Sequence, residues 1–228
     1  MSEIALVIMA RYPEVGKGKT RLAQSIGAES TFELYQAFLQ DLARRFAGWK
    51  YEVIWAYTPP DQDFLAYANT LLPEPEVPMR AVPQQGPDLG ARLYQVFQTT
   101  AQQQFTQTIL IGSDSPQVSR DMILQAQQGL EHADVVLGPA EDGGYYLIAM
   151  RQPYDVFSGI PMSTDVVLEK TIEKARQQDL KVHLLDTLFD IDTQLDLQRL
   201  ASLLQAEPAL APATAACLAT MKKRGFLA

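Results

Sequence analysis

The sequence contains almost no cysteine or histidine. Cys217 is the single cysteine among 228 residues, which excludes an intramolecular disulfide and a zinc site built from cysteines. The alanine-rich segment around Cys217 favours a helix, in which we expect this thiol to be a small buried hydrophobic group. The two histidines, His132 and His183, lie far apart in the chain, so the sequence does not indicate a histidine-based metal site either.

A positive balance of charge is also missing, and so is any long apolar run. The formal net charge is −8 and the pI is about 4.8, which argues against a nucleic-acid partner and against an anionic membrane surface, because both attract basic proteins. No apolar run approaches the roughly 18 residues of a membrane-spanning helix. The acidic start of the chain does not match a signal peptide. We therefore expect a cytoplasmic protein without a membrane span.

Strand-like and helix-like segments alternate along the chain. Short apolar runs predict strands at residues 4–10, 53–57, 79–82, 108–111, 134–137, 145–150 and 182–185. A capping box at Ser30–Glu33 predicts that a helix follows it. Helical spacing predicts further helices at residues 64–72, 88–105, 119–131, 163–178, 196–204 and 214–223. Such alternation favours a mostly parallel sheet with helices on both faces. We predict one α/β domain over residues 1–228.

A polar turn, Gly112–Pro116, follows the apolar strand predicted at residues 108–111. Ligands of open α/β sheets bind outside the carboxyl ends of the strands. A carboxylate there suits Mg²⁺ or Mn²⁺, which take oxygen ligands and often bind phosphates as well. We predict Asp114 to be a metal ligand. An aspartate that closes a turn or caps a helix would give the same local pattern.

The loop after the first predicted strand is strongly basic in an otherwise acidic protein. Its four cations are Arg11, Lys17, Lys19 and Arg21. Two glycines in the same loop let a ligand approach the backbone closely, so we predict that the loop binds a di- or triphosphate. The segment Gly18–Thr20 matches the end of a Walker phosphate-binding loop, but the first glycine of that motif falls at Pro13, which has no N–H to donate. A solvated basic loop is the structural alternative.

A second acidic segment, Asp190–Thr193, follows the strand predicted at residues 182–185. Alternation along an extended segment places Asp190 and Asp192 on the same side. Aspartates from two distant segments can hold one divalent ion between them, and we predict both residues as metal ligands beside Asp114. The alternative is that Asp192 or Thr193 simply caps the helix expected near Asp196.

A double glycine lies beside two acids in the segment Glu141–Tyr146. Gly143 and Gly144 would let a sugar or an acceptor lie against the backbone. Asp142 adjoins these glycines, and we predict it to be the catalytic carboxylate. An Asp-Gly hairpin turn explains the pattern equally simply.

The segment Gln84–Leu93 is a loop-to-helix junction that is rich in amide groups. Glutamine amides and turn backbone can hydrogen-bond to the edge of a nucleotide base. We predict that Gln85 and Gly86 contact a base. Many ordinary loop-to-helix junctions share this composition, so this motif is less specific than the others.

These segments, in this order, resemble the DUF2064 family of glycosyltransferase-like proteins, which are also similar to cofactor guanylyltransferases. The resemblance runs from residue 4 to about residue 200. Its most specific pieces are Lys19–Leu22, Gly112–Pro116, Glu141–Tyr146 and Asp190–Thr193. It implies the GT-A (Rossmann-like) fold of the nucleotide-diphospho-sugar transferase superfamily.

The resemblance also implies roles for individual residues. Asp114 and Asp192 look like the two metal ligands of the superfamily. Lys19 and Arg21 look like residues that grip nucleotide phosphates, and the turn at Gln85 looks like the one that contacts the base. The family often has Gly-Asp-Leu-Gly where this chain has Pro87-Asp88-Leu89-Gly90, and the proline restricts that turn and removes an amide donor.

Three functions are compatible with these residues. We expect a metal-dependent glycosyltransferase-like enzyme that uses a nucleotide sugar and a small acceptor, with Asp142 taking the acceptor proton. The alternative is a nucleotidyltransferase that moves a nucleoside monophosphate from a nucleoside triphosphate and releases pyrophosphate. The third possibility, from another class, is a non-catalytic nucleotide-sugar binding protein.

Overall fold

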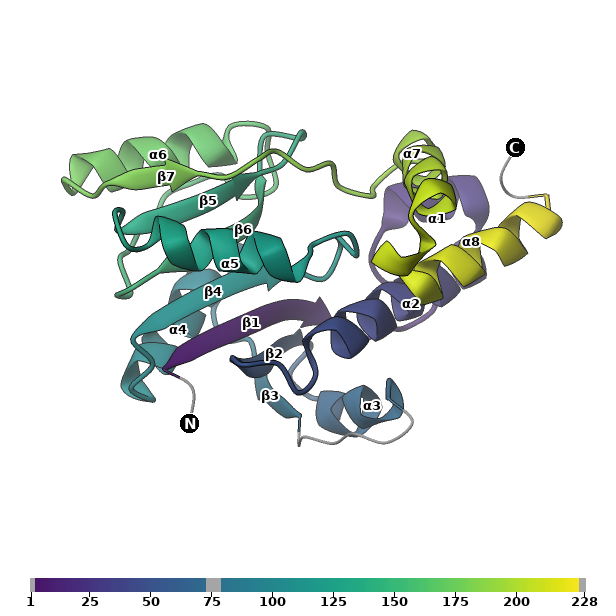
Figure 1. Cartoon of the computed structure of the whole chain (residues 1–228), viewed down its shortest axis with the longest axis horizontal. Coiled ribbons are helices and arrows are strands. Elements are labelled where there is room, and N and C mark those ends of the chain that lie inside the picture. The colour runs from purple at the N-terminus through teal and green to yellow at the C-terminus, as the bar shows by residue number, and fades with distance from the viewer. Residues whose placement is uncertain (1–2, 73–78, 226–228) are drawn as a thin grey trace.

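A computed structural model describes residues 3–72 and 79–225 (Figure 1). Its centre is a seven-stranded sheet in the order β3-β2-β1-β4-β6-β5-β7. The strands are β1 (Ile4–Arg11), β2 (Glu52–Thr58), β3 (Arg80–Pro83), β4 (Gln107–Gly112), β5 (Val135–Pro139), β6 (Tyr145–Met150) and β7 (Val182–Leu184). Between the described strands, only the pairings of β6 with β4 and β5 are antiparallel. The prediction of a mostly parallel α/β sheet is therefore confirmed.

Helices cover both faces of the sheet, as predicted. They are α1 (Thr20–Ile26), α2 (Ala28–Phe46), α3 (Phe64–Thr70), α4 (Leu89–Gln102), α5 (Arg120–Gly129), α6 (Val167–Gln177), α7 (Gln194–Ala206) and α8 (Pro212–Lys223), with a 3₁₀ turn at Pro208–Leu210. Within the described ranges, no helix is both long enough and apolar enough to cross a membrane.

The central strand β1 explains why both faces are covered. Leu6 and Ile8 point to one face, where they pack with the end of α2 and with α3 and α5. Ala5 and Val7 point to the other face, where they pack with α4 and α6. Successive side chains of a strand alternate between faces, so an unbroken apolar run such as β1 requires a cover on each side.

A third core lies beyond the carboxyl ends of the strands. It joins α1, the first half of α2, α7 and α8 through buried apolar side chains, among them Leu22, Phe38, Leu200 and Leu218. We call these helices the helical cap; they lie to the right of the sheet in Figure 1, beyond the tip of β1. Helix α2 belongs to both bodies and connects the cap to the sheet.

The structure corrects two predicted boundaries. Helix α1 was not predicted, and α2 begins at Ala28 rather than behind a capping box at Ser30–Glu33. Gly27, with φ of 84°, ends one helix and starts the next, and Thr31 donates its hydroxyl proton to the Gly27 carbonyl one turn earlier. The segment expected to be helical from residue 163 becomes α6 only at Val167. The residues before it form a turn in which Ser163 has φ of 66°.

Asp41 attaches the last helix to the fold. Its side chain is almost buried, at 2% exposure, on α2. One carboxylate oxygen accepts the Ala213 N–H at 2.8 Å, and the other accepts the Thr214 N–H at 2.8 Å and the Thr214 hydroxyl at 2.6 Å. The two N–H groups belong to the first turn of α8, where backbone donors have no partner within their own helix.

We expect Asp41→Ala to lower the free energy of unfolding by about 3 kcal/mol, because a charged acceptor is lost and buried donors are left unpaired. The matched control is Glu33→Ala, on the same helix, whose exposed ion pair with Arg224 is worth about 0.5 kcal/mol or less. Urea denaturation followed by circular dichroism measures both. Equal losses in the two variants would contradict this role for Asp41.

Candidate functional site

A pocket of about 420 Å³ opens between the carboxyl edge of the sheet and the helical cap. Its walls are formed by the ends of β1 and β4, the start of β6, the loop of residues 11–19, the first turns of α2, and the segment before α6. Its size is typical of sites for small ligands. Its position matches the rule that open α/β sheets bind ligands at this edge.

The basic loop forms one wall of the pocket. Arg11, Lys17 and Lys19 line the pocket, whereas Arg21, on α1, does not. The loop turns through Gly16 and Gly18, with φ of 78° and 82°, a conformation that favours glycine. The structure thus brings three of the four predicted phosphate-binding residues to one cavity.

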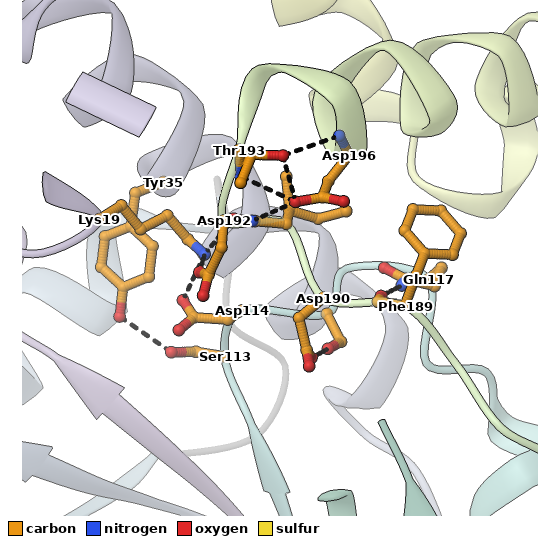
Figure 2. Close-up of polar contacts among 12 residues, drawn as sticks. Lys19, Tyr35, Ser113, Asp114, Gln117, Phe189, Asp190, Asp192, Thr193 and Asp196 are labelled. Atoms are coloured by element: carbon orange, nitrogen blue, oxygen red, sulfur yellow. Dashed lines mark hydrogen bonds and ion pairs between the residues drawn. The ribbon is translucent and has the colours of Figure 1, made fainter. Parts of the chain in front are cut away.

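Lys19 is the junction of the site. Its side chain is only 6% exposed, and its ammonium lies 3.2 Å from Asp114 Oδ1 and 3.7 Å from Asp192 Oδ1 (Figure 2). The ammonium also donates to the Ile191 carbonyl at 2.7 Å. Lys19, which we predicted to bind phosphate, therefore lies between Asp114 and Asp192, which we predicted to bind a metal ion. The sequence did not indicate that these three side chains meet.

Tyr35 is a site residue that sequence reasoning missed. Its hydroxyl accepts the Arg11 N–H at 2.9 Å and lies 2.9 Å from Ser113 Oγ, so it joins the basic loop to the residue before Asp114 (Figure 2). Burial, and then the charge of Asp114, raise the pKa of this hydroxyl, which stays protonated. Tyr35 falls within the helix predicted behind Ser30–Glu33, and no local pattern could indicate its contacts with two distant segments.

Asp190 and Asp192 are not used as helix caps. Thr193 caps α7, and Asp196 completes a capping box with it. Asp190 lines the pocket and accepts a hydrogen bond from Ser115 Oγ at 3.2 Å. Burial, and then the nearby charge of Asp142, raise the pKa of the Asp190 carboxyl to about 7. The carboxylates therefore repel one another across the acidic side of the pocket.

The turn at Asp142 has a clear structural role. It connects the antiparallel strands β5 and β6, and Asp142 Oδ1 accepts the Gly144 N–H at 2.8 Å. Gly143 has φ of 87°, and a Cβ there would lie 2.0 Å from the Asp165 carbonyl oxygen. Asp142 and Gly144 line the pocket, but Gly143 is packed against the segment before α6.

The predicted base-contacting turn lies at the rim. Gln84, rather than Gln85 or Gly86, is a lining residue, and its amide donates to the Ala10 and Ala56 carbonyls at 3.2 and 2.8 Å. Gly86 lies before α4 and packs closely against its first turn, because a Cβ there would lie 2.9 Å from the Arg92 backbone nitrogen. Gln84 thus ties β1 to β2 beside the pocket, a contact that the local sequence does not reveal.

Comparisons with known proteins agree with this architecture. A family model described as "Uncharacterized protein conserved in bacteria (DUF2064)" matches residues 41–164. The 2-phospho-L-lactate guanylyltransferase of Methanothermobacter thermautotrophicus is 25% identical over 202 residues, which cover 86% of this chain and 83% of that protein.

Two solved structures show the same fold. A protein from Desulfovibrio desulfuricans G20, described as a nucleotide-diphospho-sugar transferase, matches over 100% of both chains with a TM-score of 0.89 and 33% identity. The 4-diphosphocytidyl-2C-methyl-D-erythritol synthase of Anaerococcus prevotii DSM 20548 matches with a TM-score of 0.57 and 14% identity, over 90% of this chain and 96% of that chain, and this likeness concerns the fold alone. The chain therefore belongs to the DUF2064 family and has the GT-A-like fold of nucleotide-diphospho-sugar transferases.

Proposed function

We propose that this protein is a nucleotidyltransferase, which moves a nucleoside monophosphate from a nucleoside triphosphate to a small acceptor and releases pyrophosphate. The observation that carries this proposal is one pocket with Arg11 and Lys17 on one wall and Asp114, Asp142 and Asp190 facing it. The cations suit the triphosphate and the carboxylates suit an ion and a proton acceptor. Transferase activity at the broad level is also supported by the guanylyltransferase relative and the nucleotide-diphospho-sugar transferase structure.

Glycosyl transfer, which we expected from the sequence, is the second candidate. It depended on an open backbone at Gly143 and Gly144, but the Asp165 carbonyl fills the space beside Gly143. Gly144 and Asp142 still line the pocket, so an acceptor or a sugar can reach them. The guanylyltransferase relative, similar over 86% of this chain, favours nucleotidyl transfer.

Among the described residues no three Asp, Glu, His or Cys side chains are grouped so as to hold a metal ion, so an ion here would be held by two carboxylates, those of Asp114 and Asp192, together with the phosphates of the nucleotide. Both already converge on one positive group, the Lys19 ammonium, and their side chains are 54% and 42% exposed. Asp114 lines the pocket, whereas Asp192 lies just outside its lining, beside Lys19. We propose that these two aspartates hold Mg²⁺ or Mn²⁺, with Asp190 beside them. Such an ion, when bound, neutralises phosphate charge.

Different residues of the pocket have different roles in the proposed reaction. Arg11, Lys17 and Lys19 bind the β- and γ-phosphates, and Tyr35 keeps their loop against the end of β4. An acceptor oxygen attacks the α-phosphorus. The bond between that phosphorus and the oxygen that bridges the α- and β-phosphates breaks. Asp142 takes the acceptor proton, while pyrophosphate leaves along the basic loop.

We expect Asp114→Asn and Asp192→Asn each to weaken nucleoside triphosphate binding at least roughly ten-fold in Mg²⁺ or Mn²⁺, because an anionic ligand to the cation is lost. In EDTA the affinity should change little. Isothermal titration calorimetry with the four ribonucleoside triphosphates measures both conditions. Asp61→Asn, an exposed aspartate outside the pocket, is the matched control. Unchanged affinity of both site variants in the presence of metal would contradict the metal assignment.

Slow transfer to water separates the two reaction classes without a known acceptor. We expect nucleoside triphosphates to yield nucleoside monophosphate and pyrophosphate, and nucleotide sugars to remain intact, when each is incubated with the protein and Mn²⁺. Phosphorus NMR distinguishes these products. Asp142→Asn should reduce monophosphate formation about 100-fold while triphosphate affinity is retained. Release of nucleoside diphosphate from nucleotide sugars would instead establish glycosyl transfer.

A further inference from the structure

The cations of the pocket are confined to one wall. Among the described lining residues, every lysine and arginine belongs to residues 11–19, and Lys19 is already engaged by two carboxylates. The wall formed by the β5–β6 turn and the segment after β7 carries Asp142 and Asp190 instead. Arg199, on α7, is held by both oxygens of Glu141, at 2.6 and 2.8 Å, and does not line the pocket.

The same pocket also has an apolar part, which we call the apolar compartment. It is formed by side chains of α4, β4, β6, α6 and the segment before α6: Leu89, Leu93, Leu110, Tyr145, Ile148, Met162 and Val167. Leu110 and Ile148 are direct partners across the β4–β6 ladder and point to the face covered by α4 and α6. Met162 approaches the start of α4 so closely that a Cβ at Gly90 would lie 3.2 Å from its methyl carbon.

This distribution of charge limits which chemical class of acceptor the pocket can bind. A nucleoside triphosphate uses the three cations of the basic wall together with the divalent ion proposed at Asp114 and Asp192, and no further lysine or arginine among the described lining residues remains for a second anion. A phosphate or carboxylate on the acceptor would lie against the Asp142 carboxylate, and against Asp190 wherever that carboxyl is ionised, and like charges repel. A hydroxyl group, by contrast, can donate a hydrogen bond to either carboxylate.

We propose that the acceptor is an alcohol without anionic groups, whose hydroxyl lies at Asp142 and whose apolar body fills the compartment between α4 and α6. This inference rests on the proposed nucleotidyl transfer. The alcohol oxygen forms the new bond to the α-phosphorus, Asp142 receives the hydroxyl proton, and pyrophosphate carries away the electron pair of the broken bond. The product is a nucleoside monophosphate ester of the alcohol. In this respect the protein differs from its guanylyltransferase relative, whose name specifies a phosphorylated acid.

Binding of four probes tests the acceptor class directly. The probes are hexane-1,2-diol, propane-1,2-diol, lactate and 2-phospholactate, each added to protein with ¹³C-labelled methionine methyl groups, Mg²⁺ and an α,β-methylene nucleoside triphosphate. We expect hexane-1,2-diol to shift the Met162 methyl signal, which Met162→Leu identifies, and to bind several-fold more tightly than propane-1,2-diol. Tighter binding of lactate or 2-phospholactate overturns the proposal, and so does the absence of any shift with hexane-1,2-diol.

A charge-adding variant gives an independent test. Thr164 lies at the pocket, is exposed, and donates its hydroxyl to the Pro161 carbonyl at 2.7 Å. Thr164→Lys supplies the missing cation and should strengthen 2-phospholactate binding at least five-fold. Thr70→Lys is the matched control, because the Thr70 hydroxyl makes the same contact with Tyr67 at 2.7 Å, away from the pocket. Equal affinities in the parent protein and Thr164→Lys overturn the charge argument.

Failure of this inference and failure of the proposed function give different results. If triphosphates are cleaved to monophosphate and pyrophosphate but anionic acceptors bind best, only the acceptor class is wrong. If triphosphates are not cleaved at the α-phosphorus at all, the reaction itself is wrong.

Discussion

The ion pair network of Lys19 is the interaction on which the site depends. Its ammonium joins the loop after β1, the turn after β4 and the segment that leads into α7. A charge that is this well buried is stable only where opposite charge and hydrogen-bond acceptors surround it. The network therefore fixes where the helical cap meets the sheet edge, and the pocket lies at that junction.

Other polar contacts stabilise the same junction. Arg45, on α2, donates to the Pro116 and Val118 carbonyls at 2.6 Å, directly after the Asp114 turn. Tyr35, which lies ten residues before Arg45 on the same helix, contacts the Arg11 N–H and the Ser113 hydroxyl through its own hydroxyl. Helix α2 thus positions the basic loop and the turn that carries Asp114 together, because it belongs to both the cap and the sheet. The pocket is preorganised by these contacts before any ligand arrives.

The fold was largely predictable because its signal is local. The strands appear as apolar runs, and each predicted strand lies close to an observed one. The failures came where local patterns compete. The capping-box pattern at Ser30 is present in the sequence, but Ser30 lies inside α2, which begins at Ala28 directly after Gly27. The missed helix α1 is short and lacks a side-chain cap, so little in the sequence marks it.

The site was predictable only in part, for the same reason. Asp114 could be found because it follows a strand, and the end of a strand defines a place in the fold. The Lys19–Ile191 contact spans 172 residues, and no pattern within either segment specifies it. Gly143 shows the opposite error, since its conformation is required by the nearby backbone at Asp165 and the sequence alone suggested a ligand.

The most direct measurement is a crystal structure of the protein with Mn²⁺ and a non-hydrolysable nucleoside triphosphate, with anomalous data collected at the manganese edge. We predict an anomalous peak within bonding distance of the carboxylates of Asp114 and Asp192, with the Lys19 ammonium moved from these carboxylates to the phosphates. A triphosphate bound away from residues 11–19, or a manganese peak that neither aspartate contacts, would contradict this assignment.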